Sequence, residues 1–395
     1  MKIAGIIAEY NPFHLGHAYH VQKTKALTGC DYVVACMAGS YTQRGEAACL
    51  SKWERTRMAL CCGVDAVFEL PALFAVRTAD AFARGGVGIL AGLGVDVLSF
   101  GCEDEQLPAA LAALRQNEPA QMTQTIRRNL EAGMSHARAW GAAAAQYLGV
   151  APDLLNAPNV ILAAEYLRAI HLAGSTLQTL CVRRQGSYHD LSLDVPYASA
   201  SAIREGMRLG NRKTALAMIP ERARPILAAS RGMHAPDDLL LACLRAMSEE
   251  QLRSLPEMAE GLERRLLRSA AAASGREDLL DRLKCKRYTR ARLSRLLAHA
   301  LLGLTQDLAA RHPQPEYARL LGMREEAAPL LRELKERSTL PLVSKAKSLT
   351  SSEMFQLECR ATDLRALQCN APEDRRAGQE LTQKFILVKG DADLP

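Results

Sequence analysis

Short apolar runs alternate with helical segments through the first half of the chain, and this alternation limits the possible folds more than any other feature. The runs are apolar nearly throughout, which is typical of strands covered on both faces. We expect strands over residues 2–8, 31–36, 64–69, 95–100 and 178–183. We expect helices over residues 17–28, 51–62, 78–92 and 159–172. Such alternation indicates an α/β fold with a doubly wound, parallel, Rossmann-like sheet, whose ligand binds beyond the carboxyl ends of the strands.

The pattern becomes almost wholly helical after about residue 206. Helical periodicity covers residues 213–230, 237–255, 257–273, 276–284, 290–304 and 324–337. A further helical stretch interrupts the strands of the first half at about 105–150. We therefore predict an α/β domain over 1–208 with a helical insertion at about 105–150, and a mostly helical domain over 209–395.

Length and composition are those of an ordinary globular protein with more than one core. The chain has 395 residues, of which 48% are apolar and 24% charged. No apolar run reaches the ~18 to 20 residues that cross a bilayer, and the N-terminus lacks the pattern of a signal peptide, so we expect a cytoplasmic protein without a membrane partner. The eleven cysteines form no C-x-x-C pair, which favours reduced thiols over a zinc site.

The positive charge of the chain lies in its second half. Residues 1–205 carry 17 Lys and Arg against 18 Asp and Glu, whereas residues 206–395 carry 33 against 25. A neutral first half joined to a basic second half indicates a polyanionic partner, although basic surfaces are often only solvated.

The turn between the first predicted strand and helix carries His14, Gly16 and His17. A glycine lets the backbone approach a phosphate, and the following helix begins with free N–H groups and the positive end of its dipole. Imidazoles beside the α-phosphate of a nucleoside triphosphate donate hydrogen bonds or charge to oxygens that become more negative during attack on phosphorus. We therefore predict His14 and His17 as catalytic residues; the alternative is a strand-turn-helix unit without a ligand. His20, one helical turn further on, either joins them or lies on the helix surface.

The segment ASASAIR, residues 198–204, is a second candidate phosphate site. Ser199, Ser201 and Arg204 begin a helix directly after a loop, so two hydroxyls, free N–H groups and a guanidinium can converge on the β- and γ-phosphates. Alone, this segment is an ordinary helix N-cap. Together with the N-terminal turn, it favours a clamp for a triphosphate.

Other polar positions also lie where predicted strands end or helices begin. Arg183 and Arg184 follow the strand at 178–183 and either reach phosphate or face solvent. Gly101 allows an adenine or ribose to approach the backbone, and Asn159 either caps a helix or binds a ligand.

A polar loop after the second predicted strand includes Gln43, Arg44, Glu46, Lys52 and Arg55. It is a candidate for binding the acyl group, the second substrate or the phosphates. The sequence specifies no single one of these roles.

Residues 282–295, RLKCKRYTRARLSR, carry seven basic side chains and no acidic one. Leucines and alanines recur at spacings of three and four in the helix that follows, so one face is buried while the basic face remains free. With a tyrosine among the cations, the segment suits an RNA backbone, and a solvated surface is the alternative. The candidate RNA-binding residues are Lys284, Lys286, Arg287, Arg290, Arg292 and Arg295.

Taken together, these motifs resemble the tRNA(Met) cytidine acetate ligases, a family of the H-x-G-H nucleotidyltransferase superfamily. The resemblance runs through AEYNPFHLGHAYH, YTQRGEAA, KWERTRMAL, GVDAVFELP, FGCED, NVILAAEYL, VRRQGSYHD and ASASAIR, and continues in KRYTRARLSRLL and LKERSTLPLVSK. It spans most of the chain apart from residues 105–150 and the C-terminal tail.

The resemblance implies an ATP-dependent ligase that activates acetate as acetyl-adenylate, releases pyrophosphate, and acetylates N4 of the wobble cytidine of elongator tRNA(Met). The ATP contacts of the family map onto Ile7, Ala8, Glu9, Tyr10, Asn11, Pro12, Phe13, His14, Leu15, Gly16, His17, Ala18, Tyr19, His20, Gly101, Asn159, Arg184 and Gln185. Magnesium would accompany the triphosphate, although the sequence offers no dedicated carboxylate pair to hold it.

Two other functions use parts of the same sequence. A small-molecule adenylyltransferase of cofactor synthesis would need the N-terminal half but gives the basic half no role. A non-catalytic RNA-binding protein would need the basic half but does not explain why the histidines and the serine-arginine segment are in place.

Overall fold

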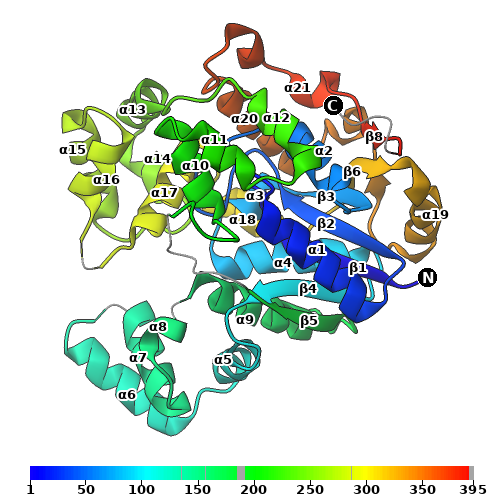
Figure 1. The fold of residues 1–395 in the computed structure, drawn as a ribbon. Helices are drawn as coiled ribbons and strands as arrows, with labels where there is room; N and C mark the ends of the chain where they lie inside the picture. Colours follow the sequence, from blue (N-terminus) through cyan, green and yellow to red (C-terminus); the bar gives the residue numbers. More distant parts are fainter. Residues whose placement is uncertain (135, 156, 185–191, 286, 391–395) are drawn as a thin grey trace.

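The computed structural model describes residues 1–134, 136–155, 157–184, 192–285 and 287–390. Five parallel strands form its centre, each within two residues of its predicted start and end. They are β1 (Ile3–Ala8), β2 (Tyr32–Ala38), β3 (Ala66–Leu70), β4 (Val97–Cys102) and β5 (Gln178–Arg183). The helices between them are α1 (Leu15–Thr28), α2 (Lys52–Cys61), α3 (Ala72–Ala75), α4 (Ala79–Gly92) and α9 (Pro158–Leu172). The predicted α/β fold with its parallel sheet is confirmed (Figure 1).

Alternate residues of β1 enter two different hydrophobic cores, so the sheet is buried on both faces. Ile3 and Ile7 pack in the core that includes residues of α4 and α9. Ala4 and Ile6 pack in the core that includes residues of α1, α2 and α10 (Ala200–Arg208). This double covering explains why the strands are apolar nearly throughout.

The helical stretch that interrupts the strand pattern forms a lobe beside β4 and β5 (Figure 1). Its helices are α5 (Leu107–Gln116), α6 (Ala120–Glu131), α7 (His136–Leu148) and α8 (Pro152–Leu155). None of the described helices is both long and apolar enough to cross a membrane.

The chain after residue 209 is mostly helical, but several predicted helices are shorter than expected. Pro220 and Pro225 divide the helix expected over 213–230 into α11 (Arg212–Ala217) and α12 (Arg224–Ala228). Ser248 caps a new helix inside the one expected over 237–255, because its side chain accepts from the N–H of Gln251. The remaining helices are α13 (Asp237–Ala246), α14 (Glu249–Arg253), α15 (Leu262–Ala272), α16 (Arg276–Leu283), α17 (Arg290–Leu302), α18 (Gln306–Arg311), α20 (Glu353–Ala366) and α21 (Gln379–Thr382).

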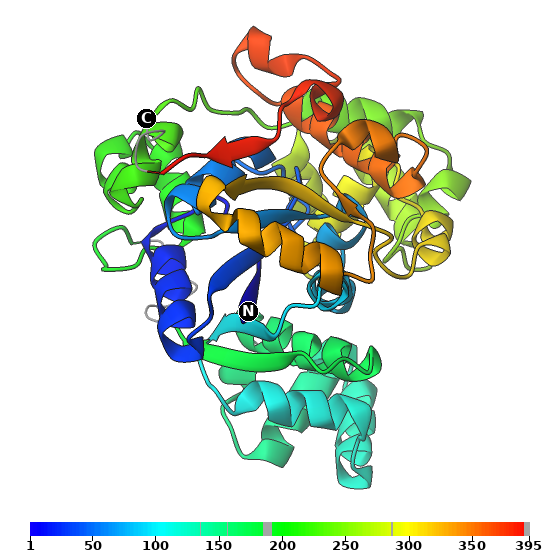
Figure 2. The same cartoon turned by 90° about the vertical axis from the view of Figure 1, so that its right-hand side faces the viewer.

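Three strands that the sequence analysis did not identify extend the sheet beyond β3. They are β6 (Ala318–Arg324), β7 (Leu342–Val343) and β8 (Ile386–Val388). Strand β6 pairs antiparallel with β3, and the strand order is β5-β4-β1-β2-β3-β6-β7, with β8 also on β6. The helix expected over 324–337 begins only at Ala328, as α19 (Ala328–Arg337), because β6 ends at Arg324 and a 3-10 helix occupies Glu325–Ala327. The second half of the chain thus returns to the sheet of the first (Figure 2).

Candidate active site

A cavity of about 410 Å³ lies at the carboxyl ends of β1, β4 and β5 and is closed on one side by the start of α10. Its position agrees with the rule that ligands of open α/β sheets bind beyond the carboxyl ends of the strands. The predicted ATP-binding residues that line it are Ile7, Ala8, Glu9, Tyr10, Asn11, His14, Gly16, His17, Tyr19, His20, Gly101, Asn159, Arg184, Ser199, Ser201 and Arg204. We call it the nucleotide cavity below.

His14 and His17 hold the start of α1 as well as lining the cavity. The Nδ1 atom of His14 accepts a hydrogen bond from the N–H of Gly16 at 3.1 Å, and the Nδ1 atom of His17 accepts from the N–H of His14 at 3.2 Å. The two rings lie 3.8 Å apart between centroids. A side chain at Gly16 would place its Cβ 2.9 Å from the His14 ring, so only glycine fits there.

These hydrogen bonds determine which ring nitrogens can face a ligand. Since each Nδ1 accepts, the neutral rings carry their proton on Nε2. Desolvation, with smaller effects of Arg184 and Arg204, lowers the pKa of His14 to about 3, and desolvation together with His14 lowers the pKa of His17 well below its usual value. Both rings are therefore neutral at pH 7 in the free protein and offer Nε2–H donors, whereas the sequence analysis left a charged imidazole open.

The backbone at the start of α1 differs from the expectation of free N–H groups. The N–H of Leu15 donates to the carbonyl of Met218, that of Gly16 to His14, and that of His17 to the carbonyl of His14. Protein acceptors thus use the N–H groups of this first turn. The two imidazoles are therefore the donors that this turn offers to the cavity.

The start of α10 has the free N–H groups that α1 lacks. Ser199 caps this nine-residue helix by accepting from the N–H of Ala202 at 3.1 Å. Among the described residues, the N–H groups of Ala200 and Ser201 have no protein acceptor, and both residues line the cavity. Arg204 donates to the carbonyl of Asn11 at 2.7 Å and to Ser201 at 3.2 Å, which fixes its guanidinium between α10 and the N-terminal turn. This end of the cavity is built for an anion.

Glu103, Asn159 and Arg184 form a polar group beside Gly101. The amide of Asn159 donates to Oε1 of Glu103 at 2.6 Å, and Nε of Arg184 lies 3.8 Å from the same oxygen. In the described part of the chain, Oε2 of Glu103 and Nε of Arg184 are buried without a hydrogen-bond partner. A buried carboxylate oxygen without a donor is costly. Asn159 and Arg184 line the cavity, whereas Glu103 is not among its lining residues.

His20 is engaged within the protein. Its Nε2 lies 2.9 Å from the hydroxyl of Ser99 on β4, and that hydroxyl lies 2.7 Å from Thr24. Desolvation, with a smaller effect of Arg184, lowers its pKa to about 4. The side chain is thus part of the cavity wall and is tied to the sheet.

The polar loop at 41–47 also lines the cavity, with Thr42, Gln43, Arg44 and Glu46. The N–H of Gln43 donates to Oε1 of Glu9 at 2.7 Å, and burial raises the pKa of Glu9. Arg55, by contrast, is fully buried and donates to the carbonyls of Glu9, Ala38 and Gly39, so its role is structural.

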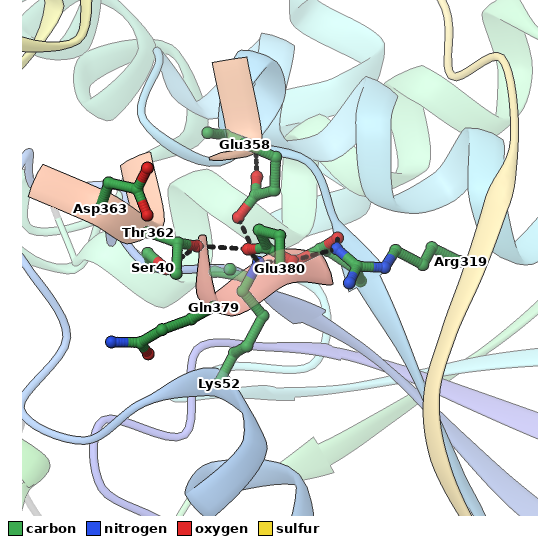
Figure 3. A network of polar contacts seen from close by, with 12 residues as sticks. Ser40, Lys52, Arg319, Glu358, Thr362, Asp363, Gln379 and Glu380 are labelled. Atoms are coloured by element: carbon green, nitrogen blue, oxygen red, sulfur yellow. Dashed lines mark hydrogen bonds and ion pairs between the residues drawn. The ribbon is translucent and has the colours of Figure 1, made fainter. Parts of the chain in front are cut away.

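Lys52 also lies outside the nucleotide cavity. Its ammonium contacts the carboxylates of Glu69, Glu358 and Glu380, and Arg319 completes this buried ion cluster (Figure 3). The three carboxylates are the one set of ligand-type side chains in the described residues that is close enough for a metal ion. The ammonium occupies the place between them, so the cluster has no bearing on a metal in the nucleotide cavity.

Some predicted ATP-binding residues do not line the cavity. Phe13 is fully buried in the core and packs 4.8 Å from the ring of Tyr10. Pro12, Leu15 and Ala18 contribute to the turn and helix that hold the histidines. Gln185 lies outside the described residues.

The cavity also has an apolar wall, which was not predicted from the sequence. Phe100 and Tyr166 lie 5.9 Å apart between ring centroids and line it together with Ile161 and Leu162. In sequence these residues are indistinguishable from core positions of a strand and a helix, so no local signal marks them. Tyr197 also lines the cavity and packs on Tyr19. Because it directly precedes the serine-arginine segment, its place in the site could have been predicted from the sequence.

The predicted RNA-binding residues have different surroundings. Arg295 is 9% exposed and paired with Glu257, which contradicts its prediction as a surface phosphate contact. Arg292 donates to the carbonyl of Glu257, and Arg290 pairs with Glu277 and Asp281. Lys284 and Arg287 are exposed, whereas Lys286 lies outside the described residues.

Fold and site together define a nucleotidyltransferase of the H-x-G-H class. A family model described as "HIGH Nucleotidyl Transferase" matches residues 1–380. The chain is 35% identical to the tRNA(Met) cytidine acetate ligase of Acetivibrio thermocellus over 98% of this chain and 100% of that protein. It is also 35% identical to the protein of the same name from Thermoanaerobacter sp. (strain X514), over 93% of this chain and 95% of that one.

Solved structures give the same result. The apo crystal structure of Thermotoga maritima TmcAL superposes with a TM-score of 0.91 at 28% identity, over 98% of this chain and 100% of that one. The structure of the same protein bound with alpha-thio ATP gives 0.88 at 27% identity, with the same coverage. The chain belongs to the tRNA(Met) cytidine acetate ligase family.

Proposed function

We propose that this protein is an ATP-dependent ligase that acetylates N4 of the wobble cytidine of elongator tRNA(Met), with acetyl-adenylate as the intermediate. The observation that carries the proposal is the nucleotide cavity, where His14 and His17 and the capped start of α10 line the same space in a chain of this family. ATP and acetate enter, pyrophosphate leaves after the first step, and AMP leaves after the second.

Different residues around the cavity suit the phosphates, the ribose and the base of ATP. The N–H groups of Ala200 and Ser201 and the guanidinium of Arg204 suit the β- and γ-phosphates. Asn159 and Arg184 suit the ribose hydroxyls, and the wall made by Phe100 and Tyr166 suits a flat base.

The first step joins acetate to the α-phosphorus. An acetate oxygen forms the new bond to phosphorus while the bond to the bridging oxygen of pyrophosphate breaks, and pyrophosphate leaves with the electron pair. Acetate is already ionised, so the step needs stabilisation of charge more than a base. The Nε2–H groups of His14 and His17 supply it by donating to the phosphate oxygens as their charge grows.

Magnesium would be held mainly by the triphosphate. Of the carboxylates lining the cavity, Glu9 accepts a backbone hydrogen bond and Glu46 lies between two guanidinium groups. Neither forms a carboxylate pair of the kind that holds a metal alone, so Mg²⁺ bound to phosphate oxygens is the arrangement these residues fit. It would neutralise charge on the leaving pyrophosphate.

We assign the ATP chemistry to residues 1–208 and tRNA binding to the chain after 209. Lys284, Lys286, Arg287, Arg290 and Arg292 form the proposed basic patch, in which Lys286 lies outside the described residues and from which we remove the buried Arg295. Since tRNA is the substrate, we expect the protein to act in the cytoplasm.

Lys284 and Arg287 are exposed and their side chains have no partner among the described residues, so they should contribute most to the patch. Lys284→Glu with Arg287→Glu should weaken tRNA binding about tenfold and lower the slope of log affinity against log salt by roughly 2. The same charge change at exposed Lys345 and Lys347 is the matched control. Equal tRNA affinity for both double variants in filter binding would place the patch elsewhere.

The function is tested with ATP, labelled acetate and tRNA(Met). We expect acetate-dependent exchange between ATP and pyrophosphate, and N4-acetylcytidine in nuclease digests of the tRNA. His17→Ala should abolish both while tRNA binding survives. AMP retained in a small product, with no modified tRNA, would favour a small-molecule adenylyltransferase. Binding of tRNA without exchange would favour a non-catalytic protein.

A further inference from the structure

A second cavity, of about 240 Å³, adjoins the nucleotide cavity across the loop 41–47. Thr42, Gln43 and Arg44 line the nucleotide cavity, whereas Tyr41, Gly45 and Ala47 line the second one. Glu46 lines both. Nothing in the proposed handling of ATP uses the second cavity.

The walls of the second cavity suit a flat ring with polar edges. Met233, Leu240, Leu297 and Leu301 supply apolar surface. The hydroxyl of Tyr41 accepts from the amide of Gln368 at 3.0 Å, so its own hydrogen is available to an acceptor on a ligand. A pyrimidine base is smaller than the drug-sized ligands that fill cavities of roughly 300 to 1,000 Å³, which agrees with the smaller volume here.

Glu46 lies where the two cavities meet. Its Oε2 is 3.9 Å from Nη2 of Arg204 in the nucleotide cavity, and its Oε1 is 3.9 Å from Nη2 of Arg276 in the second. Both distances are too long for hydrogen bonds. The side chain is 43% exposed, so the carboxylate remains open to a donor from a ligand.

The loop that carries Glu46 is fixed against the second half of the chain. The N–H of Thr42 donates to the carbonyl of Glu46, and the N–H of Gly45 donates to the carbonyl of Thr42, both at 2.9 Å. The hydroxyl of Ser294 on α17 donates to the carbonyl of Arg44 at 2.5 Å and accepts from Arg276 at 2.6 Å. Glu46 is therefore held at the junction.

We propose that the second cavity receives the cytosine base of the tRNA, with its exocyclic amine directed at Glu46; this rests on the function proposed above. Cytosine presents an amine donor and two acceptors on one edge, which complements a carboxylate and the Tyr41 hydroxyl. Arg276, which lines the same cavity, adds a positive charge that suits the phosphates beside an unstacked nucleotide.

With the cytosine amine directed at Glu46, this carboxylate can accept the proton that the amine loses in the second step. The N4 nitrogen forms a bond to the carbonyl carbon of acetyl-adenylate, and the bond from that carbon to the phosphate oxygen breaks as AMP leaves with the electron pair. The nitrogen loses one proton, which Glu46 accepts and passes to water. Base and acyl group then approach each other from adjoining cavities.

The experiment fills the second cavity while the nucleotide cavity stays open. Ala235 lines the second cavity and is exposed, and an indole at this position is larger than a pyrimidine. For Ala235→Trp we expect the ratio of acetyl transfer to ATP–pyrophosphate exchange to fall at least tenfold, while the Kd for tRNA changes less than threefold. Ala272→Trp, at an exposed position of α15 that lines neither of the two cavities, should keep the wild-type ratio.

A second variant tests the carboxylate without filling space. Glu46→Gln keeps the shape but accepts no proton, so the same ratio should fall at least tenfold. Wild-type ratios in both variants would overturn the proposal while leaving the ligase function in place. A higher KM for acetate in the exchange reaction of Ala235→Trp, with a wild-type ratio at saturating acetate, would assign the cavity to the acyl substrate. Wild-type protein that fails in exchange or in tRNA acetylation would refute the proposed function itself.

Discussion

His14 has two separable roles at the residue scale, because its two ring nitrogens face different partners. Nδ1 caps α1 by accepting from Gly16, whereas Nε2 is the donor that we propose for the phosphate. Asparagine is a good N-cap residue and offers an oxygen near the position of Nδ1, but it has no counterpart of Nε2.

His14→Asn should therefore fold normally and lose activity. We expect a Tm close to that of the wild type and a fall of about 10²- to 10³-fold in acetate-dependent exchange, the usual effect of removing one donor to a developing charge. His14→Ala is the control, since it also loses the cap and about 1 kcal/mol of stability. Near-wild-type exchange in His14→Asn would limit His14 to capping.

His20 should make stability depend on pH. Its pKa is about 4 in the folded protein and ~6.5 when unfolded, so between these values the unfolded chain binds more protons and stability falls as pH falls. His20→Gln can still reach Ser99 but does not titrate. The difference in Tm between wild type and variant should shrink from pH 7 to pH 4.5 in calorimetry; a constant difference would show that His20 titrates normally.

At the scale of elements, the contact between the loop 41–47 and α17 depends on Gly45. Its φ is +73°, and a Cβ there would lie 2.6 Å from the carbonyl oxygen of Ser294. Gly29 has a φ of +61° with nothing within 4 Å, so it shares the backbone conformation without the crowding.

Gly45→Ala should cost more than Gly29→Ala. The left-handed conformation alone costs about 1 to 2 kcal/mol, and we expect Gly45→Ala to exceed this by at least roughly 1 kcal/mol because the loop has to move away from α17. Urea unfolding of both variants measures the difference. Equal losses of unfolding free energy in the two variants would mean that α17 moves away from the loop at no measurable cost in stability.

The elements that could be predicted are those with a local pattern. The five parallel strands, buried on both faces, are visible as apolar runs, and the turn with His14 and His17 follows the first of them. Strand β6 was missed because its partner, β3, lies some 250 residues earlier, as the pairing of Phe68 with Leu320 illustrates. Likewise, Phe100 and Tyr166 resemble core residues until the fold places them beside the cavity, and no pattern in the basic segment distinguishes buried Arg295 from exposed Arg287.

At the scale of the whole molecule, the buried ion cluster joins the two halves of the chain. Lys52 and Glu69 come from the first half, and Arg319, Glu358 and Glu380 from the second (Figure 3). All five side chains are at most 6% exposed. Charges this deeply buried need their partners.

Lys52→Met should destabilise the whole protein. Without the ammonium, three carboxylates stay close together and Arg319 is the remaining cation of the cluster. We therefore expect the free energy of unfolding in urea to fall by about 3 to 5 kcal/mol. Lys347→Met, at an exposed position, should change stability by less than about 0.5 kcal/mol. A loss below 1 kcal/mol for Lys52→Met would show that the cluster stabilises little.

The antiparallel pairing of β3 with β6 has a consequence for how the chain is made. During synthesis the N-terminal strands leave the ribosome first, yet the open edge of β3 gains its neighbour only when residues 318–324 have emerged. The last carboxylate around Lys52 arrives later still, with Glu380. The nascent chain therefore cannot complete this sheet until residues 318–324 and 386–388 have left the ribosome.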